Sequence, residues 1–137
     1  MVGNMKYEII RAEEEWQRAG AYSVRIQGMN RQHHISLREE FDDHDTDGTR
    51  YIVLLDDGYP IATCRFYEVN AIEVVLGRVV VLPEYRGKSI GRKVVEEAEK
   101  WIMELGYVCI DGTLVKSGNF DCTRMHKMIW RKDQCVI

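Results

Sequence analysis

Hydrophobic and polar residues alternate along this chain with two different periods, one typical of strands and the other typical of helices. Strands are predicted over residues 5–11, 51–55, 61–69, 73–82 and 107–114. Helices are predicted over residues 13–27, 34–39 and 90–105. In the first of these helices, the residues predicted to be buried are Trp16, Ala19 and Val24. The chain therefore mixes both kinds of element.

Several connections between these elements carry turn signals. Asp57-Gly58 lies between two strand patterns and predicts a tight hairpin. An isolated glycine inside a strand often marks a bulge, so a bulge is predicted near Gly77. The acidic stretch 39–48 ends in a turn signal and is predicted to be an exposed loop, because it is too polar for the core.

Length and composition limit the possible classes of protein. A length of 137 residues predicts a single domain over residues 1–137. The formal net charge of −3 argues against a nucleic-acid partner, which would require clustered positive charge. No stretch approaches the roughly 18 apolar residues of a membrane helix, and the first residues lack a secretory pattern. A cytoplasmic location without a membrane partner is therefore expected.

A basic turn separates the strand 73–82 from the helix 90–105. Four basic residues gather at the start of this helix: Arg86, Lys88, Arg92 and Lys93. Positive charge at a helix N-terminus is unfavourable by about 0.3–1 kcal/mol per residue, whereas an anion is stabilised there by free backbone N–H groups. Gly87 and Gly91 would allow an anion to approach the backbone closely. The turn is therefore predicted to bind an anion, unless it is an ordinary solvated basic turn.

The residues of the turn exclude two common phosphate-binding motifs. A Walker A loop requires glycine at the position of Leu82, and a dinucleotide fingerprint starting at Gly87 requires glycine at Ser89 and Arg92. The segment Arg86-Gly87-Lys88-Ser89-Ile90-Gly91 instead resembles motif A of the GNAT (Gcn5-related) N-acetyltransferases, Arg/Gln-x-x-Gly-x-Gly/Ala. Because Ser89 replaces the usual first glycine, a backbone conformation other than left-handed is expected there.

The resemblance implies an α/β (α+β) fold with a mixed, mostly antiparallel central sheet, flanking helices, and a V-shaped splay between the fourth and fifth strands. It also implies acetyl-CoA as the cosubstrate. The main chain that would pair with its pantetheine arm belongs to Val79, Val80 and Val81. The turn that would hold the pyrophosphate comprises Gly87, Lys88, Ser89, Ile90, Gly91 and Arg92. The charges for the remaining phosphate would come from Arg86, Lys88, Arg92 and Lys93.

The first part of the chain is similar to the small bacterial ElaA-like branch of the same family. The residues that fall in its register are Arg25, Ile35, Glu40, Phe41, Asp42 and Asp45. The residues that depart from it are Gly28, Met29, Asn30, Gln32 and His33. After Leu114 the chain is shorter than the family pattern, and residues 120–127 resemble the family's last strand. A helix and a strand are therefore expected to be missing, and a homodimer is expected to complete the sheet.

No residue stands out as a general base. Glu73 lies early on the fourth predicted strand, and Glu40 and His34 lie in the region expected near the acceptor. These three residues are the candidates for catalysis, and solvated surface or helix-cap roles are the alternative for Glu40 and His34. His33 and His34 point in different directions on a helix, so no metal site is expected.

The resulting hypothesis is an acetyl-CoA-dependent N-acetyltransferase that acts on a primary amine of a small molecule or a peptide. The acidic stretch 39–47 favours a cationic acceptor. The alternative is a non-catalytic GNAT-like module that binds CoA or mediates oligomerisation. The absence of a tyrosine after Leu114 favours that alternative, because such a tyrosine commonly protonates the departing thiolate in the family.

Overall fold

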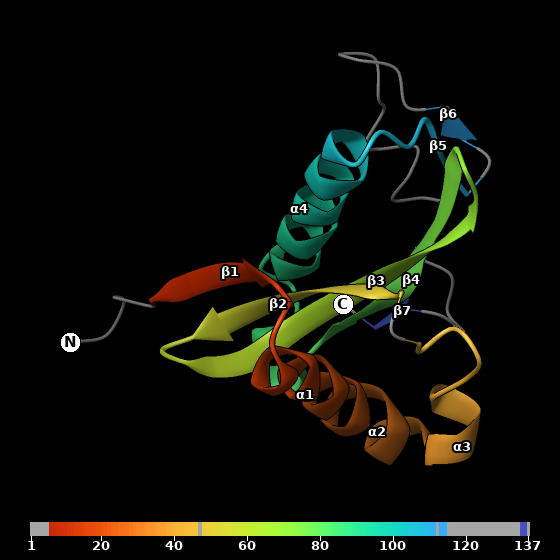
Figure 1. The fold of residues 1–137 in the computed structure, drawn as a ribbon. Coiled ribbons are helices and arrows are strands. Elements are labelled where there is room, and N and C mark those ends of the chain that lie inside the picture. Colours follow the sequence, from red (N-terminus) through yellow and green to blue (C-terminus); the bar gives the residue numbers. More distant parts are fainter. Residues whose placement is uncertain (1–5, 47, 112, 115–134, 137) are drawn as a thin grey trace.

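The structure is a computed structural model that describes residues 6–46, 48–111, 113–114 and 135–136. Helix α4 covers one face of a twisted central sheet, and helices α1 to α3 lie on the other (Figure 1). The strands are β1 (Tyr7–Arg11), β2 (Arg50–Asp56), β3 (Tyr59–Asn70), β4 (Glu73–Val81), β5 (Cys109–Ile110), β6 (Thr113–Leu114) and β7 (Cys135–Val136). The helices are α1 (Glu15–Arg25), a π-helical turn (Ile26–Asn30), α2 (Arg31–His33), α3 (Leu37–Glu40), a 3-10 turn (Pro83–Tyr85) and α4 (Ile90–Glu104).

Strands β1 to β4 form an antiparallel meander, and β5 then pairs with β4 in parallel. Strand β2 is buried on both faces: Ile52 and Leu54 belong to the main core, and Val53 belongs to a smaller cluster under α1. Strand β5 pairs with β4 only at Glu73 and Val74. Beyond these residues the two strands diverge, which confirms the predicted fold class and its V-shaped splay.

The hairpin and the bulge are both present where the sequence predicts them. Asp57 and Gly58 both have positive φ, as a two-residue hairpin requires. Between the pairs Thr63–Val80 and Arg65–Gly77, β4 contains one residue more than β3. The residue with positive φ in this bulge is Arg78, at 49°, so the bulge lies directly after the predicted glycine.

The first helical region is longer than predicted. Helical backbone continues without a break from α1 through the π-helical turn and α2 to His33, instead of ending near Gln27. Val24 is buried, but Trp16 is exposed and Ala19 also faces solvent, so these two predictions are wrong. The buried face instead contains Ala21 and Val24 of α1 and Gly28 of the π-helical turn, because this helical region packs on the sheet through small residues spaced three and four apart.

Three other predicted elements differ. The short helix is α3, which begins at Leu37, because His34 has a left-handed backbone that ends α2. The predicted strand 107–114 is a hairpin in which β5 and β6 pair antiparallel, and the left-handed Asp111 begins the chain reversal. In the sequence Asp111 is followed by glycine, and an Asp-Gly pair favours a tight turn. The predicted last strand at residues 120–127 lies outside the described residues.

Candidate functional site

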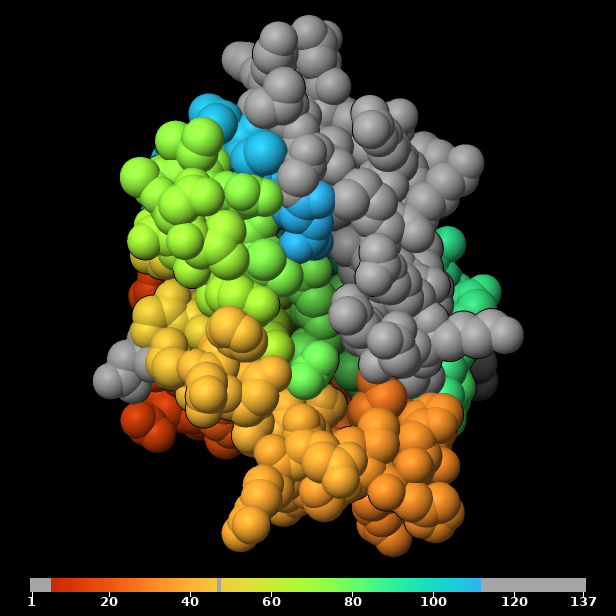
Figure 2. Space-filling model, turned by 90° about the vertical axis from the view of Figure 1, so that its right-hand side faces the viewer, coloured from red at the N-terminus to blue at the C-terminus, as the bar shows by residue number. Residues whose placement is uncertain are grey.

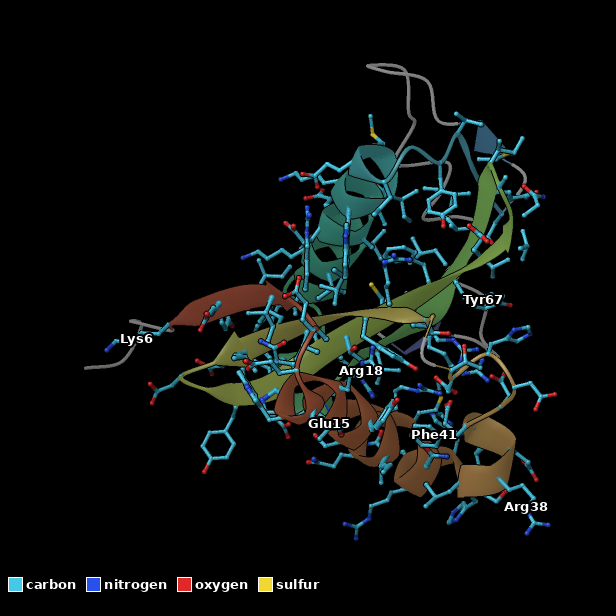
Figure 3. The ribbon with its side chains drawn as sticks, viewed as in Figure 1. Lys6, Glu15, Arg18, Arg38, Phe41 and Tyr67 are labelled. Carbon is cyan, nitrogen blue, oxygen red and sulfur yellow. The ribbon has the colours of Figure 1, made fainter. Side chains whose placement is uncertain are left out.

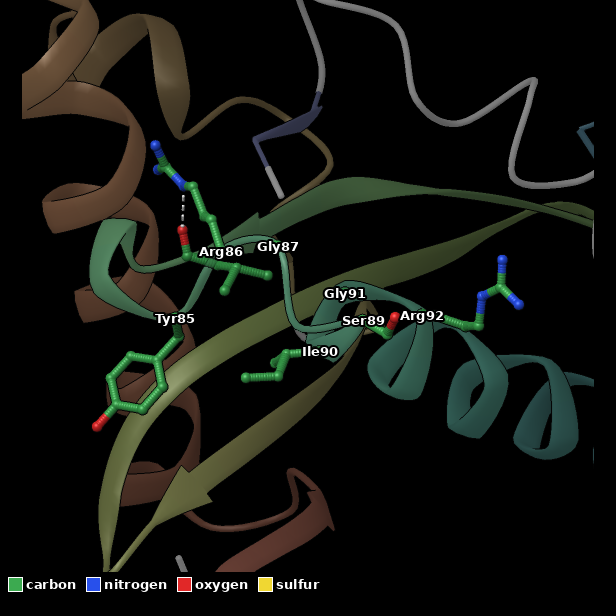
Figure 4. Close-up of a pocket in the computed structure, with 8 residues that line it drawn as sticks. Tyr85, Arg86, Gly87, Ser89, Ile90, Gly91 and Arg92 are labelled. Carbon is green, nitrogen blue, oxygen red and sulfur yellow. Dashed lines mark hydrogen bonds between the residues drawn. The ribbon is translucent and has the colours of Figure 1, made fainter. Parts of the chain in front are cut away.

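The basic turn forms one wall of a pocket of about 290 Å³ (Figure 4). Strand β4 leads into the 3-10 turn, in which Pro83 occupies the first position, and the chain then crosses to the N-terminus of α4. The residues that line the pocket are Val81, Tyr85, Arg86, Gly87, Ser89, Ile90, Gly91 and Arg92. The first N–H groups of α4 have no acceptor within the helix, so they are available to a ligand. The structure therefore brings together seven of the predicted cofactor residues.

The turn depends on two left-handed residues, Gly87 at φ 79° and Ser89 at φ 62°. The expectation that Ser89 would avoid this conformation is wrong. The motif's backbone is kept although the glycine is not, because the chain must turn sharply from Gly87 into α4. Ser89 makes no side-chain cap with the helix, so its side chain does not compensate for the strain of its backbone.

Arg86 points away from the turn in Figure 4 and connects it to the π-helical turn. Its Nε donates to the Val81 carbonyl at 2.8 Å, and its Nη2 donates to the Gly28 carbonyl at 2.9 Å. Its Nη1 donates to Gln32 Oε1 at 3.3 Å. Burial lowers the pKa of Arg86, although the nearby Glu84 acts to raise it. These contacts give the Arg86 side chain a structural role in holding the end of β4.

Lys88 and Arg92 remain as the positive charges nearest the pocket. Neither residue takes part in an ion pair within the described part of the chain. The Lys88 ammonium lies 5.6 Å from the centre of the Tyr85 ring, and the Lys93 ammonium lies 5.2 Å from that of Tyr7. Lys88, Arg92 and the N-terminus of α4 together fit a phosphate-bearing ligand.

Tyr85 lines the pocket but is not suited to donate a proton in a reaction. Its hydroxyl donates to Asp56 Oδ2 at 2.6 Å. This hydrogen bond, assisted by burial, raises the pKa of Tyr85 to about 12. The side chain therefore fixes the start of the turn to β2.

The outer edge of β4 has a neighbour at each end. Near its start, β5 lies beside Glu73 and Val74, and near its end, β7 lies in parallel beside Val79 and Val80. Between them, the Leu76 N–H donates to a carboxylate oxygen of Asp111 at 3.4 Å. The edge that the family resemblance assigns to the pantetheine arm is thus paired with β7 in this structure.

A second cluster of functional groups lies where the loop after α3 meets β3 and β4. In Figure 2 this loop, in yellow-orange, lies against the green surface of β3 and β4. Three arginines and three carboxylates alternate in this cluster: Arg25, Arg65, Arg78, Glu40, Asp42 and Asp45. Their formal charges cancel. Hereafter we call these six residues the charge cluster.

The side chains of Glu40 and Asp45 are buried, so the prediction of an exposed acidic loop is wrong at these two positions, whereas Asp42 is exposed as predicted. The side chain of Arg25 is fully buried, and that of Glu40 is 3% exposed. Arg25 binds both carboxylate oxygens of Asp45, at 2.7 and 3.1 Å, and lies over the ring of Phe41, which is labelled in Figure 3. A polar stretch is buried here because every charge has an oppositely charged partner. The paired carboxylates are no longer free to attract a cationic acceptor.

Burial and pairing shift the carboxyl pKa values in opposite directions. Burial raises the pKa of Glu40 above its usual value, despite the lowering by Arg25 and Arg78. Burial also acts to raise the pKa of Asp45, but hydrogen bonds and charge from Arg25 outweigh it and hold that pKa well below its usual range. The pKa of Asp42 is likewise lowered, since Arg65 outweighs burial.

The three candidate catalytic residues lie in three different places. Glu73 begins β4, at the opposite end of the strand from the basic turn, and its carboxylate accepts from Asn70 at 3.4 Å. Glu40 belongs to the charge cluster, with its carboxylate 3.0 Å from Arg78 Nε. His34 is exposed at the end of α2. The structure therefore does not assemble them into one catalytic group.

Sequence reasoning missed two arginines of the charge cluster, Arg65 and Arg78, whereas Arg25 falls in the ElaA-like register. Arg65 lies between Cys64 and Phe66, and Arg78 directly precedes three valines. This was the available signal, because a charge inside a buried strand requires a partner. His44 was also missed. Its ring stacks on Tyr67, labelled in Figure 3, with ring centres 4.0 Å apart.

The comparisons with known proteins agree with the fold and the turn. The sequence profile of the "Acetyltransferase (GNAT) family" matches residues 9–128. The chain belongs to the GNAT family. Members of this family use acetyl-CoA. This assignment confirms the resemblance that the basic turn carries.

Individual relatives share about a third or less of their residues with this GNAT chain over the matched region. An uncharacterised acetyltransferase of Streptococcus pyogenes serotype M1 is 34% identical over 71 residues, which are 52% of this chain and 50% of the relative. The chain thus matches about half the length of such curated relatives. A crystal structure of a Lactobacillus plantarum protein assigned as an N-acetyltransferase is 34% identical, with a TM-score of 0.69, over 76% of this chain and 73% of that one.

Two further solved structures share the fold. Escherichia coli ElaA has a TM-score of 0.59 at 17% identity, over 73% of this chain and 70% of ElaA. A Brucella melitensis GNAT acetyltransferase in complex with acetyl-CoA has a TM-score of 0.62 at 23% identity, over 79% of this chain and 77% of that one. Among the described residues, no helix has the length and apolar character needed to cross a membrane.

Proposed function

We propose that this GNAT protein is an acetyl-CoA-dependent N-acetyltransferase that transfers an acetyl group to a primary amine of a small molecule or peptide. The observation that carries the proposal is the pocket at the start of α4, with its left-handed residues Gly87 and Ser89 and with Lys88 and Arg92, which form no ion pair with any described residue. The acetyl-CoA complex of the Brucella melitensis relative supports it.

The chain's residues fit the parts of this cosubstrate as follows. The N–H groups at the start of α4 would bind the pyrophosphate, and Lys88 and Arg92 would supply the neighbouring positive charge. The main chain of Val79 to Val81 would hold the pantetheine arm as an added strand, in the place that β7 takes in this structure. When bound, acetyl-CoA supplies the activated acetyl group.

The reaction we propose is direct attack of the acceptor amine on the thioester within a ternary complex. The protein contributes by orienting the two reactants and by directing backbone N–H groups at the carbonyl oxygen. The amine must first lose a proton. Glu40 is buried against Arg78, and His34 is exposed and does not line the pocket, so we propose that this proton leaves through water.

The alternative function, a non-catalytic module that binds CoA or mediates oligomerisation, is favoured by one observation. Strand β7 pairs with Val79 and Val80, the residues that would otherwise hold the pantetheine arm. If β7 remains there, the basic turn could bind the phosphates while the acetyl group finds no place on β4. Binding and activity therefore have to be measured separately.

The test is calorimetric titration of the purified protein with acetyl-CoA. We expect saturable binding that is at least tenfold weaker, about 1.4 kcal/mol, in the double variant Lys88→Ala, Arg92→Ala. The matched control is Arg38→Ala, Lys100→Ala, which removes the same charge from exposed helix positions. No binding to a folded protein at millimolar ligand would exclude the proposed function, and binding without turnover across an amine panel would support the alternative.

A further inference from the structure

Arg78 is the point at which the loop after α3 contacts the strand proposed to hold the cosubstrate. It is the extra residue of the β4 bulge and lies directly before Val79. Its side chain is 20% exposed, so it is largely covered by the residues around it. The bulge thus connects the loop after α3 to the part of β4 that would hold the cosubstrate.

Three contacts hold the Arg78 guanidinium to this loop. Its Nε lies 3.0 Å from a carboxylate oxygen of Glu40. Its Nη2 donates to the Glu40 carbonyl and to Asp42 Oδ2, each at 3.3 Å. The loop therefore restrains Arg78 through main-chain and side-chain groups at once, which limits the directions that the guanidinium can take.

The loop can act as an anchor because the remaining members of the charge cluster fix it to other elements. Asp45 is bound by Arg25 from α1 at 2.7 Å, by Arg65 from β3 at 2.8 Å, and by the Tyr51 hydroxyl from β2 at 2.8 Å. Asp42 accepts two bonds from Arg65, at 3.2 and 3.3 Å. Residues 40–45, at the end of α3 and in the loop after it, are thus tied to α1, β2 and β3 independently of Arg78.

The backbone of the bulge is strained at Arg78. A left-handed backbone is unfavourable for arginine, since its side chain crowds the following carbonyl group. Gly77 has open space where a side chain would be, so no described residue packs on the bulge from that position. The guanidinium contacts of Arg78 are therefore well placed to decide the direction in which β4 leaves the bulge.

We propose that Arg78, held by Glu40 and Asp42, is a positioning residue that sets the backbone direction of Val79 to Val81 and thereby orients the thioester carbonyl. This inference rests on the proposed function, because it requires acetyl-CoA on that stretch of β4. It assigns the charge cluster a role in the reaction without direct contact between its carboxylates and the substrate.

Infrared difference spectroscopy of bound acetyl-CoA, labelled with ¹³C at the carbonyl, reports on this orientation without any acceptor. A carbonyl that accepts a directed hydrogen bond absorbs at lower frequency, and the wild-type protein is expected to lower it. Arg78→Gly removes the guanidinium, and glycine adopts the left-handed backbone of this position without steric cost. We expect this variant to lose about half or more of the wild-type shift. Glu40→Gln, which leaves Arg78 in place, should lose part of the shift in the same direction.

The controls separate orientation from simple destabilisation. Arg11→Ala removes ion pairs to Glu97 and Glu104 outside the charge cluster and should leave the carbonyl frequency unchanged. CoA, which lacks the acetyl group, should bind both wild type and Arg78→Gly saturably, and the spectra are recorded at saturation of each protein, so that a change in affinity is not counted as a change in orientation. A wild-type shift that persists in Arg78→Gly and Glu40→Gln would overturn the inference alone. Absence of acetyl-CoA binding to wild type would overturn the proposed function itself.

Discussion

Among the described residues, five that are not glycine have a left-handed backbone: His34, Asp57, Arg78, Ser89 and Asp111. Aspartate tolerates this conformation well, and the two aspartates lie at chain reversals. Arg78 and Ser89 have no such intrinsic preference, and both lie beside the proposed cosubstrate site. Unfavourable backbone conformations tend to persist where the surrounding structure enforces them, which is common at functional sites.

Replacement of Ser89 by glycine tests how much strain the basic turn contains. Relief of the left-handed serine should stabilise the folded state by about 1–2 kcal/mol. The greater freedom of glycine in the unfolded chain offsets about 0.4–1 kcal/mol of this stabilisation. Ser89→Gly should therefore raise the free energy of unfolding by about 0.5–1 kcal/mol, measured by urea denaturation.

The matched control is Ser36→Gly, at a serine with extended backbone that caps α3 by accepting from the Glu39 N–H at 3.2 Å. That variant should be neutral or destabilising, because it removes a cap and relieves no strain. Equal effects of the two replacements would show that Ser89 is not strained.

At the scale of elements, the π-helical turn is packed unusually closely on β4. A side-chain Cβ built on Gly28 would lie 2.6 Å from Val80 Cγ1. The Gly28 carbonyl also accepts from Arg86 at 2.9 Å. The glycine therefore lets this helical segment reach both the strand proposed to hold the cosubstrate and the residue that fixes its end.

Gly28→Ala should be destabilising by about 1–3 kcal/mol, since the new methyl group overlaps Val80. Thermal and urea unfolding measure the change. Gly20→Ala is the control, because its nearest contact would be an ordinary 3.4 Å to Pro60 and alanine favours helix. In a protein that already carries Val80→Ala, adding Gly28→Ala should cost less stability than it costs in wild type, because the Val80 methyl group that it overlaps is gone. If Gly28→Ala matched Gly20→Ala in stability, close packing would not explain this glycine.

The elements that the sequence predicts correctly are those set by neighbouring residues. The Asp57-Gly58 hairpin and helix α4 with Gly106 after it depend on local turn chemistry and on a strong helical period. The charge cluster could not be predicted in this way, because Arg25, Asp45 and Arg65 meet only after three separate elements have packed. The prediction that Trp16 is buried was wrong for the same reason, because its exposure depends on where the sheet lies and not on helical period.

The loop that carries the acidic members of the charge cluster should make the protein sensitive to acid. The pKa values of Asp42 and Asp45 are lowered in the folded state, so the unfolded chain binds protons more readily. Their contribution to stability is therefore present above about pH 4 and is lost as the pH falls below it. Urea denaturation at a series of pH values should show this loss.

Asp42→Asn should show a smaller fall in stability below about pH 4 than wild type, because one of these carboxylates no longer titrates. The control is Asp43→Asn, at an exposed neighbour that makes no ion pair within the described residues. Glu40 acts in the opposite direction, since its raised pKa favours protonation of the folded state. A pH dependence identical in wild type and Asp42→Asn would contradict this account.

At the scale of the whole molecule, the first and last described strands pair with the sheet over different lengths. Strand β1 pairs with β2 over five residues, and it borders the rest of the meander. Strand β7 is two residues long and pairs with β4 at the splay. Strand β7 therefore lies on the edge that the proposed function assigns to the pantetheine arm (Figure 1).

Because β7 and the pantetheine arm would use the same backbone groups of Val79 and Val80, they should compete. A ligand that must displace a docked segment binds with an apparent affinity reduced by the fraction of protein in which the site is open. Two strand residues contribute on the order of two backbone hydrogen bonds, so a chain that ends at Gln134 should bind acetyl-CoA about tenfold more tightly in calorimetry. Adenosine 3′,5′-bisphosphate, which lacks the arm, should bind both chains equally, since it needs only the basic turn. An equal gain for both ligands would point to a change in the turn, and no gain for either would show that β7 does not compete.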